Sequence, residues 1–182
     1  MANNQTIHDP QGKIALLVID VQQGLFERPT PLYQAEQLIN NINMLINKAR
    51  QANAEVLYVQ HVNKSILAKG TAAWQLHDAI RPLPTETIIH KCYGSAFEET
   101  VLHGKLMVRG VRQIVVTGLT THGCIKATCQ NALDLGYTVI LIEDGHSSYA
   151  KEAAALVKKW NEKLSEQGVV LQKAAQMDFC NN

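Results

Sequence analysis

Residues 115–129 read VVTGLTTHGCIKATC and contain, in close succession, an apolar strand, a turn and the start of a helix. The β-branched residues before Gly118 are typical of a strand, and the glycine marks the turn. A thiol at Cys124 would meet unpaired backbone N–H groups and the positive end of the helix dipole, which favour the thiolate. The segment therefore predicts a nucleophilic cysteine on a turn between a strand and a helix.

Apolar segments of this kind alternate with helix-like segments along the chain. Continuous apolar runs are typical of strands that are buried on both faces, and apolar residues at helical spacing are typical of amphipathic helices. The expected strands are 14–19, 55–61, 86–91, 113–117, 137–142 and 169–172, and the expected helices are 32–52, 97–110, 124–135 and 150–167. This alternation predicts an α/β fold, a three-layer α/β/α Rossmann-like sandwich with a mainly parallel sheet of about six strands.

The length of 182 residues is that of one domain. We expect a single domain over residues 1–182, with loose tails at 1–12 and 175–182. Residues 63–83 have no clear period, and we expect them to form a long, partly helical loop of the kind that covers a site.

The composition excludes several classes of partner. The formal net charge is +1 and no run of like charges occurs, which argues against nucleic acid and anionic membranes. The longest apolar runs have about six residues, whereas a membrane span needs about 20. The four cysteines form no CxxC pair and no zinc-binding pattern, and the N-terminus does not resemble a signal peptide. We expect a cytoplasmic protein with free thiols, no metal and no cofactor.

Three chemically reactive residues fall at the carboxyl ends of expected strands. Asp20 closes the first strand, Lys91 closes the third, and Cys124 follows the fourth. In an open α/β sheet such ends meet at one edge, where ligands bind. Cys124 would attack a carbonyl carbon, Asp20 would accept the thiol proton, and Lys91 would stabilise both anions. Backbone N–H groups of the turn before Cys124 would bind the oxyanion.

At this point the chain resembles the isochorismatase-like cysteine hydrolases, the superfamily that includes nicotinamidases and N-carbamoylsarcosine amidohydrolases. The matching motifs are LVIDVQ (17–22), GT (70–71) with LH (76–77), KCYGSAF (91–97) with Thr100, GLTTHGC (118–124) and ALDLGY (132–137). The likeness extends over roughly residues 13–148, and the first four of these motifs occur in the family's order.

The resemblance implies an Asp–Lys–Cys catalytic triad of Asp20, Lys91 and Cys124. It also implies a cis peptide bond between Leu119 and Thr120, which would direct the N–H groups of Thr120 and Cys124 at the oxyanion. It further implies a small-molecule substrate and a homo-oligomer, a dimer or tetramer. Nicotinamidases carry an Asp-x-His metal motif after the second strand, whereas residues 61–65 here read HVNKS. This departure predicts a metal-free member of the family.

Several residues near the expected site have more than one interpretation. The expected substrate-binding residues lie in or beside its loops and turn, and they are Phe26, Trp74, Tyr93, Leu119 and Thr121. Cys92 is a rival nucleophile that we expect to pack, and Cys129 is expected in the core. His61, His77 and His122 lack a metal-binding motif, so we interpret them as loop or surface residues, although His122 flanks the turn. Asp144 and His146 follow the fifth strand, where they could cap the next segment, and we leave them out of the expected site.

The sequence thus favours a cysteine hydrolase that cleaves a small amide, carbamoyl or ester bond through a covalent acyl-enzyme on Cys124. The alternative is a non-catalytic or regulatory α/β binding module that retains the fold. A nucleotide-binding protein is disfavoured because the first strand is followed by residues 20–24, DVQQG, and not by G-x-G-x-x-G.

Overall fold

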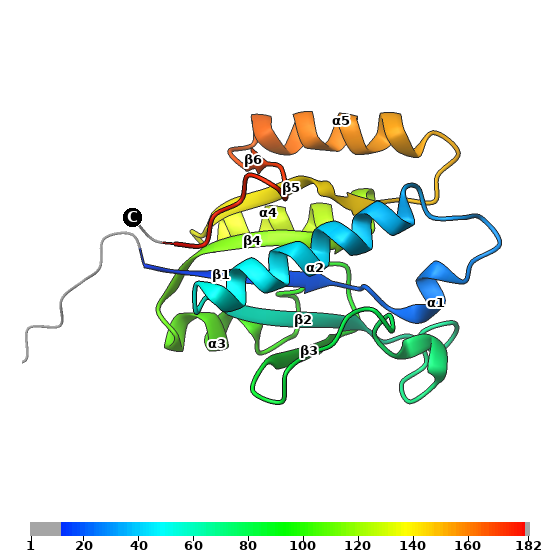
Figure 1. Cartoon of the computed structure of the whole chain (residues 1–182), viewed down its shortest axis with the longest axis horizontal. Coiled ribbons are helices and arrows are strands. Elements are labelled where there is room, and N and C mark those ends of the chain that lie inside the picture. Colours follow the sequence, from blue (N-terminus) through cyan, green and yellow to red (C-terminus); the bar gives the residue numbers. More distant parts are fainter. Residues whose placement is uncertain (1–11, 181–182) are drawn as a thin grey trace, which may run out of the picture.

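The computed structural model describes residues 12–180 and contains a six-stranded sheet in the order β3-β2-β1-β4-β5-β6 (Figure 1). Every neighbouring pair of strands is parallel. The strands are β1 (Lys13–Ile19), β2 (Glu55–His61), β3 (Thr87–Lys91), β4 (Val111–Leu119), β5 (Thr138–Ser147) and β6 (Val170–Gln172). The predicted α/β fold with a parallel sheet is confirmed.

Helices cover both faces of the sheet (Figure 1). They are α1 (Gln23–Phe26), α2 (Ala35–Gln51), α3 (Leu102–Val108), α4 (Lys126–Asp134) and α5 (Ala153–Glu166). Along β1, Leu16 and Val18 pack with α2 on one face, whereas Leu17 and Ile19 pack with α3 and α4 on the other. A strand buried on both faces needs apolar residues at every position, which explains the continuous run in the sequence.

The close approach of β4 to β1 fixes where the reactive residues lie. Gly118 pairs with Ile19, has a φ of +121°, and a Cβ built on it would lie 2.0 Å from the Ile19 carbonyl oxygen. Only glycine fits this backbone and this contact. The turn that follows β4 is therefore held against the end of β1, where Asp20 begins the next segment.

The predicted helix over 97–110 is wrong in its first half. The helix α3 begins only at Leu102, because Glu99 has a φ of +52° that a helix does not tolerate. Ser95 Oγ accepts from the Phe97 N–H, and the Ala96 N–H donates to Thr128 Oγ1. These side-chain hydrogen bonds replace the helical ones and tie the segment to α4.

The long loop over 63–83 contains only one short 3₁₀ helix, Ala72–Trp74. A bridge between Gln22 and Leu76 and a hydrogen bond from the Gln23 N–H to the Gln75 carbonyl hold it against the chain that follows β1. The loop thus lies beside the carboxyl edge of the sheet, where the sequence predicts the site.

The prediction of a loose tail over 175–182 is wrong for residues 175–180. Met177 and Phe179 are 3% exposed and pack in the same cluster as α2. Lys48 Nζ donates to the carbonyl oxygens of Ala174, Ala175 and Met177. The other predicted tail, 1–12, lies outside the described residues except for Gly12, as do residues 181–182.

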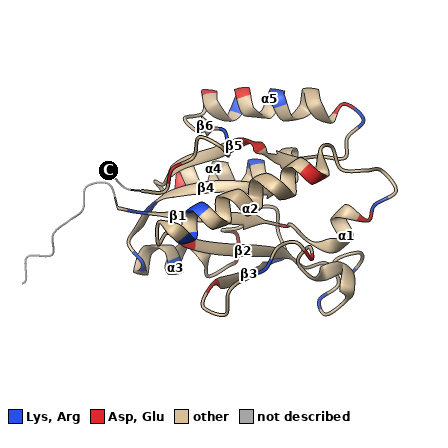
Figure 2. Ribbon diagram, in the orientation of Figure 1, with Lys and Arg blue, Asp and Glu red and all other residues tan. Residues whose placement is uncertain are grey.

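Among residues 12–180, no helix combines the length and the apolarity that a membrane crossing requires. Acidic and basic residues both occur along α5 and are spread over other elements (Figure 2).

Candidate active site

The structure brings Asp20, Lys91 and Cys124 together at the carboxyl edge of the sheet. Asp20 follows β1, Lys91 ends β3, and Cys124 lies in the turn Thr121–Ile125 between β4 and α4. Lys91 Nζ lies 2.7 Å from Asp20 Oδ2 and 3.1 Å from Cys124 Sγ. One buried ammonium therefore contacts both a carboxylate and a thiol that are distant in sequence.

Lys91 is the centre of this cluster. Its side chain has no exposed surface, and its Nζ also lies 3.1 Å from the Tyr93 carbonyl oxygen and 3.2 Å from His61 Nδ1. An ammonium has three N–H groups, so four neighbours share them. A buried charge is tolerated only when it is paired and hydrogen-bonded in this manner.

Asp20 is buried, with an exposed fraction of 2%. Its Oδ2 binds Lys91, whereas its Oδ1 is buried and has no hydrogen-bond partner among residues 12–180. Burial raises the pKa of Asp20, and the charge of Lys91 opposes this effect. Asp20 thus has an unused acceptor atom and an increased affinity for a proton, as a general base requires.

Cys124 differs from the sequence-based expectation of a thiol acidified by a helix. The α-helix α4 begins at Lys126, and Cys124 lies in the preceding turn, where Gly123 is non-helical with φ −105° and ψ −107°. Burial and the negative charge of Asp20 raise the pKa of Cys124 to about 11. The resting thiol is therefore protonated near neutral pH, and a base must remove its proton.

The turn that carries Cys124 is fixed by its own backbone. The Thr120 carbonyl oxygen accepts from the N–H groups of Gly123 and Ile125 at 3.0 and 3.2 Å. The Leu119–Thr120 peptide bond is cis, as the family resemblance implies. A Cβ on Gly123 would lie 2.8 Å from Thr120 Oγ1, so a larger residue would disturb the turn.

His61, which we interpret from the sequence as a loop or surface residue, belongs to the cluster. It ends β2, the strand between β1 and β3, and this position in the strand order is what places it beside Lys91. Burial and the charge of Lys91 lower its pKa, so the ring is neutral and Nδ1 accepts from the ammonium. No motif indicates this contact, because it depends on the order of the strands.

Asp20, His61 and Cys124 offer ligand atoms within 4.8 Å of one another, and all three are of types that bind zinc. Lys91 Nζ, however, contacts all three side chains at 2.7–3.2 Å. A divalent cation would have to displace this ammonium, so these residues fit an internal cation better than a metal.

Two of the expected substrate-binding residues have exposed side-chain surface. Phe26 is half-buried, and its ring centroid lies 4.5 Å from that of His77. Tyr93 is 43% exposed, and its carbonyl oxygen binds Lys91. Their role in binding a substrate stays a prediction.

The other three expected residues have little or no such surface. Trp74 is 9% exposed and packs edge-on against His90, with 5.1 Å between the ring centroids. Leu119 and Thr121 are fully buried, and Thr121 Oγ1 bonds His146 Nδ1. Neither of the last two offers a side-chain contact to a substrate, because the turn folds both side chains into the protein.

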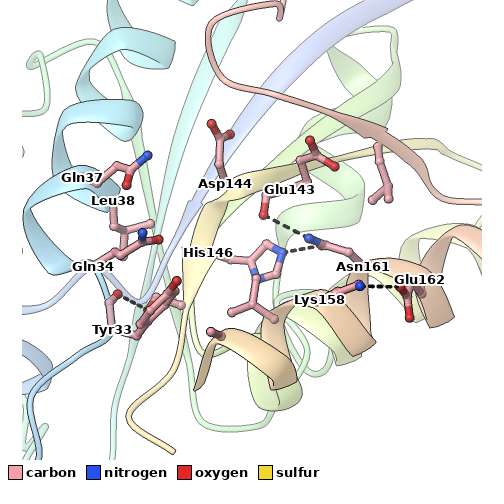
Figure 3. Close-up of a pocket in the computed structure, with 14 residues that line it drawn as sticks. Tyr33, Gln34, Gln37, Leu38, Glu143, Asp144, His146, Lys158, Asn161 and Glu162 are labelled. Carbon is pink, nitrogen blue, oxygen red and sulfur yellow. Dashed lines mark hydrogen bonds and ion pairs between the residues drawn. The ribbon is translucent and has the colours of Figure 1, made fainter. Parts of the chain in front are cut away.

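The remaining cysteines are outside the cluster. Cys129 is buried in the core, as predicted, whereas Cys92 is exposed and not packed. A separate cavity of about 380 Å³ lies between α2, β5 and α5, and residues of β5 and α5 such as Glu143, His146 and Asn161 line it (Figure 3). Its lining does not include Asp20, Lys91 or Cys124.

Comparisons with known proteins identify the relatives of this chain. The isochorismatase domain model matches residues 14–171. The chain is 36% identical over 135 residues to the isochorismatase family protein YddQ of Bacillus subtilis (strain 168), covering 71% of this chain and 75% of that protein. It is 32% identical to a streptothricin hydrolase of Streptomyces noursei, covering 77% of this chain but about half (51%) of that protein.

The fold agrees as well. A solved isochorismatase family protein superposes with a TM-score of 0.83 at 26% identity, covering 88% of this chain and 98% of the other. The family model spans most of the chain, and one relative exceeds 30% identity over most of both lengths. The chain therefore belongs to the isochorismatase family of hydrolases.

Proposed function

We propose that this protein is a cysteine hydrolase that cleaves a small amide, carbamoyl or ester bond through an acyl-enzyme on Cys124. The observation that carries the proposal is the buried contact of one ammonium, Lys91, with both the Asp20 carboxylate and the Cys124 sulfur. An ion pair that only stabilises the fold does not need a thiol beside it. A cysteine nucleophile, in contrast, needs a base beside its thiol.

In the first step the Cys124 sulfur attacks the substrate carbonyl carbon while Asp20 takes the thiol proton. The free Oδ1 of Asp20 supplies the acceptor, and its raised pKa favours the transfer. Lys91 remains charged and stabilises the anion that forms beside it. The N–H groups of Thr120 and Cys124 are the proposed donors to the tetrahedral oxyanion.

In the second step the protonated Asp20 gives its proton to the leaving nitrogen or oxygen, and the bond to the carbonyl carbon breaks. A thioester on Cys124 and a free amine or alcohol result. Water then attacks the thioester while Asp20 accepts its proton. The C–S bond breaks, Asp20 returns that proton to the departing sulfur, and the acid product and the Cys124 thiol are released. The net reaction consumes one water and returns every residue to its starting state.

The substrate is expected to be small and to lie against Phe26 and Tyr93. One relative is named a streptothricin hydrolase, so hydrolysis is also its activity, although this chain spans only about half of that protein. We extend the proposal to a homo-oligomer, a dimer or tetramer, in the cytoplasm. Light scattering would measure the oligomeric state.

A screen of small amides, N-carbamoyl compounds and esters, with detection of released ammonia or alcohol, tests the proposal. Cys124→Ala should abolish any activity found, whereas Cys92→Ser, which changes the exposed neighbouring cysteine, should leave it unchanged. Activity that survives Cys124→Ala would show that the nucleophile is assigned to the wrong residue. A folded protein that binds small molecules but hydrolyses none would favour the binding-module alternative.

A further inference from the structure

A chain of hydrogen bonds, buried at the Thr121 end and part-buried at Asn161, begins at the turn that carries Cys124. Thr121 Oγ1 lies 2.9 Å from His146 Nδ1, and His146 Nε2 lies 2.8 Å from Asn161 Oδ1. Asn161 Nδ2 in turn donates to the Glu143 carbonyl oxygen at 3.0 Å. Figure 3 shows the His146 ring pointing toward Asn161 of α5, with both interactions of Asn161 drawn.

The positions of the protons in this chain follow from its last bond. A backbone carbonyl only accepts, so the Asn161 amide must present its NH₂ group to Glu143 and its oxygen to His146. His146 therefore carries its proton on Nε2, and its Nδ1 has a free lone pair. The Thr121 hydroxyl must donate to that lone pair, so the chain has one direction.

The imidazole ring of His146 is neutral near neutral pH in the folded protein. It is 4% exposed, and burial lowers its pKa to about 4, although Asp144 and the bond to Asn161 oppose this effect. A neutral ring in a fixed tautomer is a rigid acceptor. A role of His146 as a cap of the next segment does not account for this pair of bonds.

The acceptor atom, His146 Nδ1, contacts Thr121, the residue that begins the turn carrying Cys124. Thr121 is the first residue of Thr121–Ile125, three positions before Cys124. His146 itself pairs with Gly118 in the sheet, so its backbone is fixed to β4 while its ring holds the turn after β4. His146 thus holds both ends of the segment 118–121, Gly118 through the sheet and Thr121 through the hydrogen bond.

We propose that His146 is a positioning residue, which through Thr121 holds the turn so that the sulfur of Cys124 stays in contact with Lys91 and Asp20. The proposal rests on the proposed function of Cys124. A displacement of about 1 Å at a reacting atom can cost about 10²-fold in rate, so an anchor of this kind has a kinetic effect beyond stability.

Two conservative substitutions at His146 separate its two bonds. In His146→Asn the side-chain oxygen takes the place of Nδ1, so the acceptor for Thr121 is kept and the bond to Asn161 is lost. In His146→Gln the terminal NH₂ takes the place of Nε2, so the bond to Asn161 is kept and the acceptor for Thr121 is lost. Thr121→Ser keeps the hydroxyl and Thr121→Val removes it, which forms a second matched pair.

The variants are compared by stopped-flow acylation with p-nitrophenyl acetate, with kcat and KM measured separately and scaled to the folded fraction from circular dichroism. His146→Gln and Thr121→Val should each lower kcat by about tenfold or more and leave KM nearly unchanged. His146→Asn and Thr121→Ser should stay within about threefold of the unsubstituted protein. Equal kcat values in all four variants, or losses that follow only thermal stability, would overturn the proposal.

A crystal structure of Thr121→Val gives a readout that does not depend on turnover. The distance between Lys91 Nζ and Cys124 Sγ should exceed its value of 3.1 Å by more than coordinate error. An unchanged distance would contradict the positioning role even if Cys124 proved not to be the nucleophile. Conversely, an absence of acylation in the unsubstituted protein together with a displaced sulfur would overturn the hydrolase proposal and leave the positional coupling intact.

Discussion

Lys91 and Asp20 form an ion pair in which Nζ and Oδ2 are 2.7 Å apart and the two side chains are 0% and 3% exposed. Removing two charges from water costs free energy that their attraction only partly returns. A pair of this kind is therefore poor support for stability by itself. Its contact with the Cys124 thiol is the feature on which the proposed function rests, in which a base and a cation lie beside a protonated nucleophile.

Lys91→Met should lower the free energy of unfolding by about 3–5 kcal/mol at neutral pH, because it leaves the Asp20 charge buried without its partner. Urea denaturation measures this loss. The double variant Asp20→Asn with Lys91→Met should recover much of it, since no charge remains, and should still lack hydrolytic activity. A single variant as stable as the parent protein would show that the pair is not coupled as described.

Chelation of divalent cations should leave hydrolysis unchanged. Lys91 Nζ already contacts Asp20, His61 and Cys124, and so it supplies the positive charge that a metal would otherwise bring. Dialysis against EDTA followed by assay with and without added Zn²⁺ is the measurement, and excess Zn²⁺ should inhibit by competing for the same three side chains. Activity that is lost with EDTA and restored by a metal would contradict this account of the cluster.

The stability of the fold should decrease in acid because of His146. Its pKa is about 4 in the folded protein against an ordinary value of 6.5, so the unfolded chain binds the proton more readily. Stability from this residue is complete above pH 6.5, falls as the pH decreases toward about 4, and is lost below it. The total corresponds to about 3 kcal/mol.

His146→Asn is the control for this prediction, because it removes the titrating group and keeps one hydrogen bond. The difference in unfolding free energy between the two proteins should change with pH across that window. A difference that is constant between pH 7 and pH 4 would mean that His146 titrates normally in the folded state.

Gly118→Ala should be far more damaging than Gly136→Ala, although both glycines have positive φ, +121° and +82°. At Gly118 the added Cβ would lie 2.0 Å from the Ile19 carbonyl oxygen, whereas at Gly136 it meets nothing within 4 Å. The expected losses in stability are about 3 kcal/mol or more for the first and about 1 kcal/mol for the second. Similar melting temperatures for both variants would show that β1 can move away from β4.

Much of the fold and the central trio could be predicted from the sequence for a specific reason. Residues 14–19 form a continuous apolar run and 114–116 a shorter one within the expected strand 113–117; such runs indicate parallel strands, whose carboxyl ends meet at one edge. Asp20, Lys91 and Cys124 each stand at or just beyond such an end. Their convergence therefore follows from topology, without knowledge of any distance.

The partners of the trio could not be predicted in the same way. His61 contacts Lys91 because β2 lies between β1 and β3, and His146 contacts Thr121 because of the register between β4 and β5. Strand order and register are global properties that local patterns do not contain. The raised pKa of Cys124 likewise follows from burial, which the position beside a helix did not reveal. The left-handed Glu99, which shortens α3, has no signature in a residue type that favours helices.

The covalent step on Cys124 is the central claim, and mass spectrometry of the enzyme quenched during turnover of p-nitrophenyl acetate tests it most directly. Peptide mapping should place one acetyl group on Cys124. The adduct should be absent from Cys124→Ala and should form much more slowly in Asp20→Asn. Hydrolysis that proceeds with the adduct on Cys92, or with Cys124 unmodified at every quench time, would contradict the account.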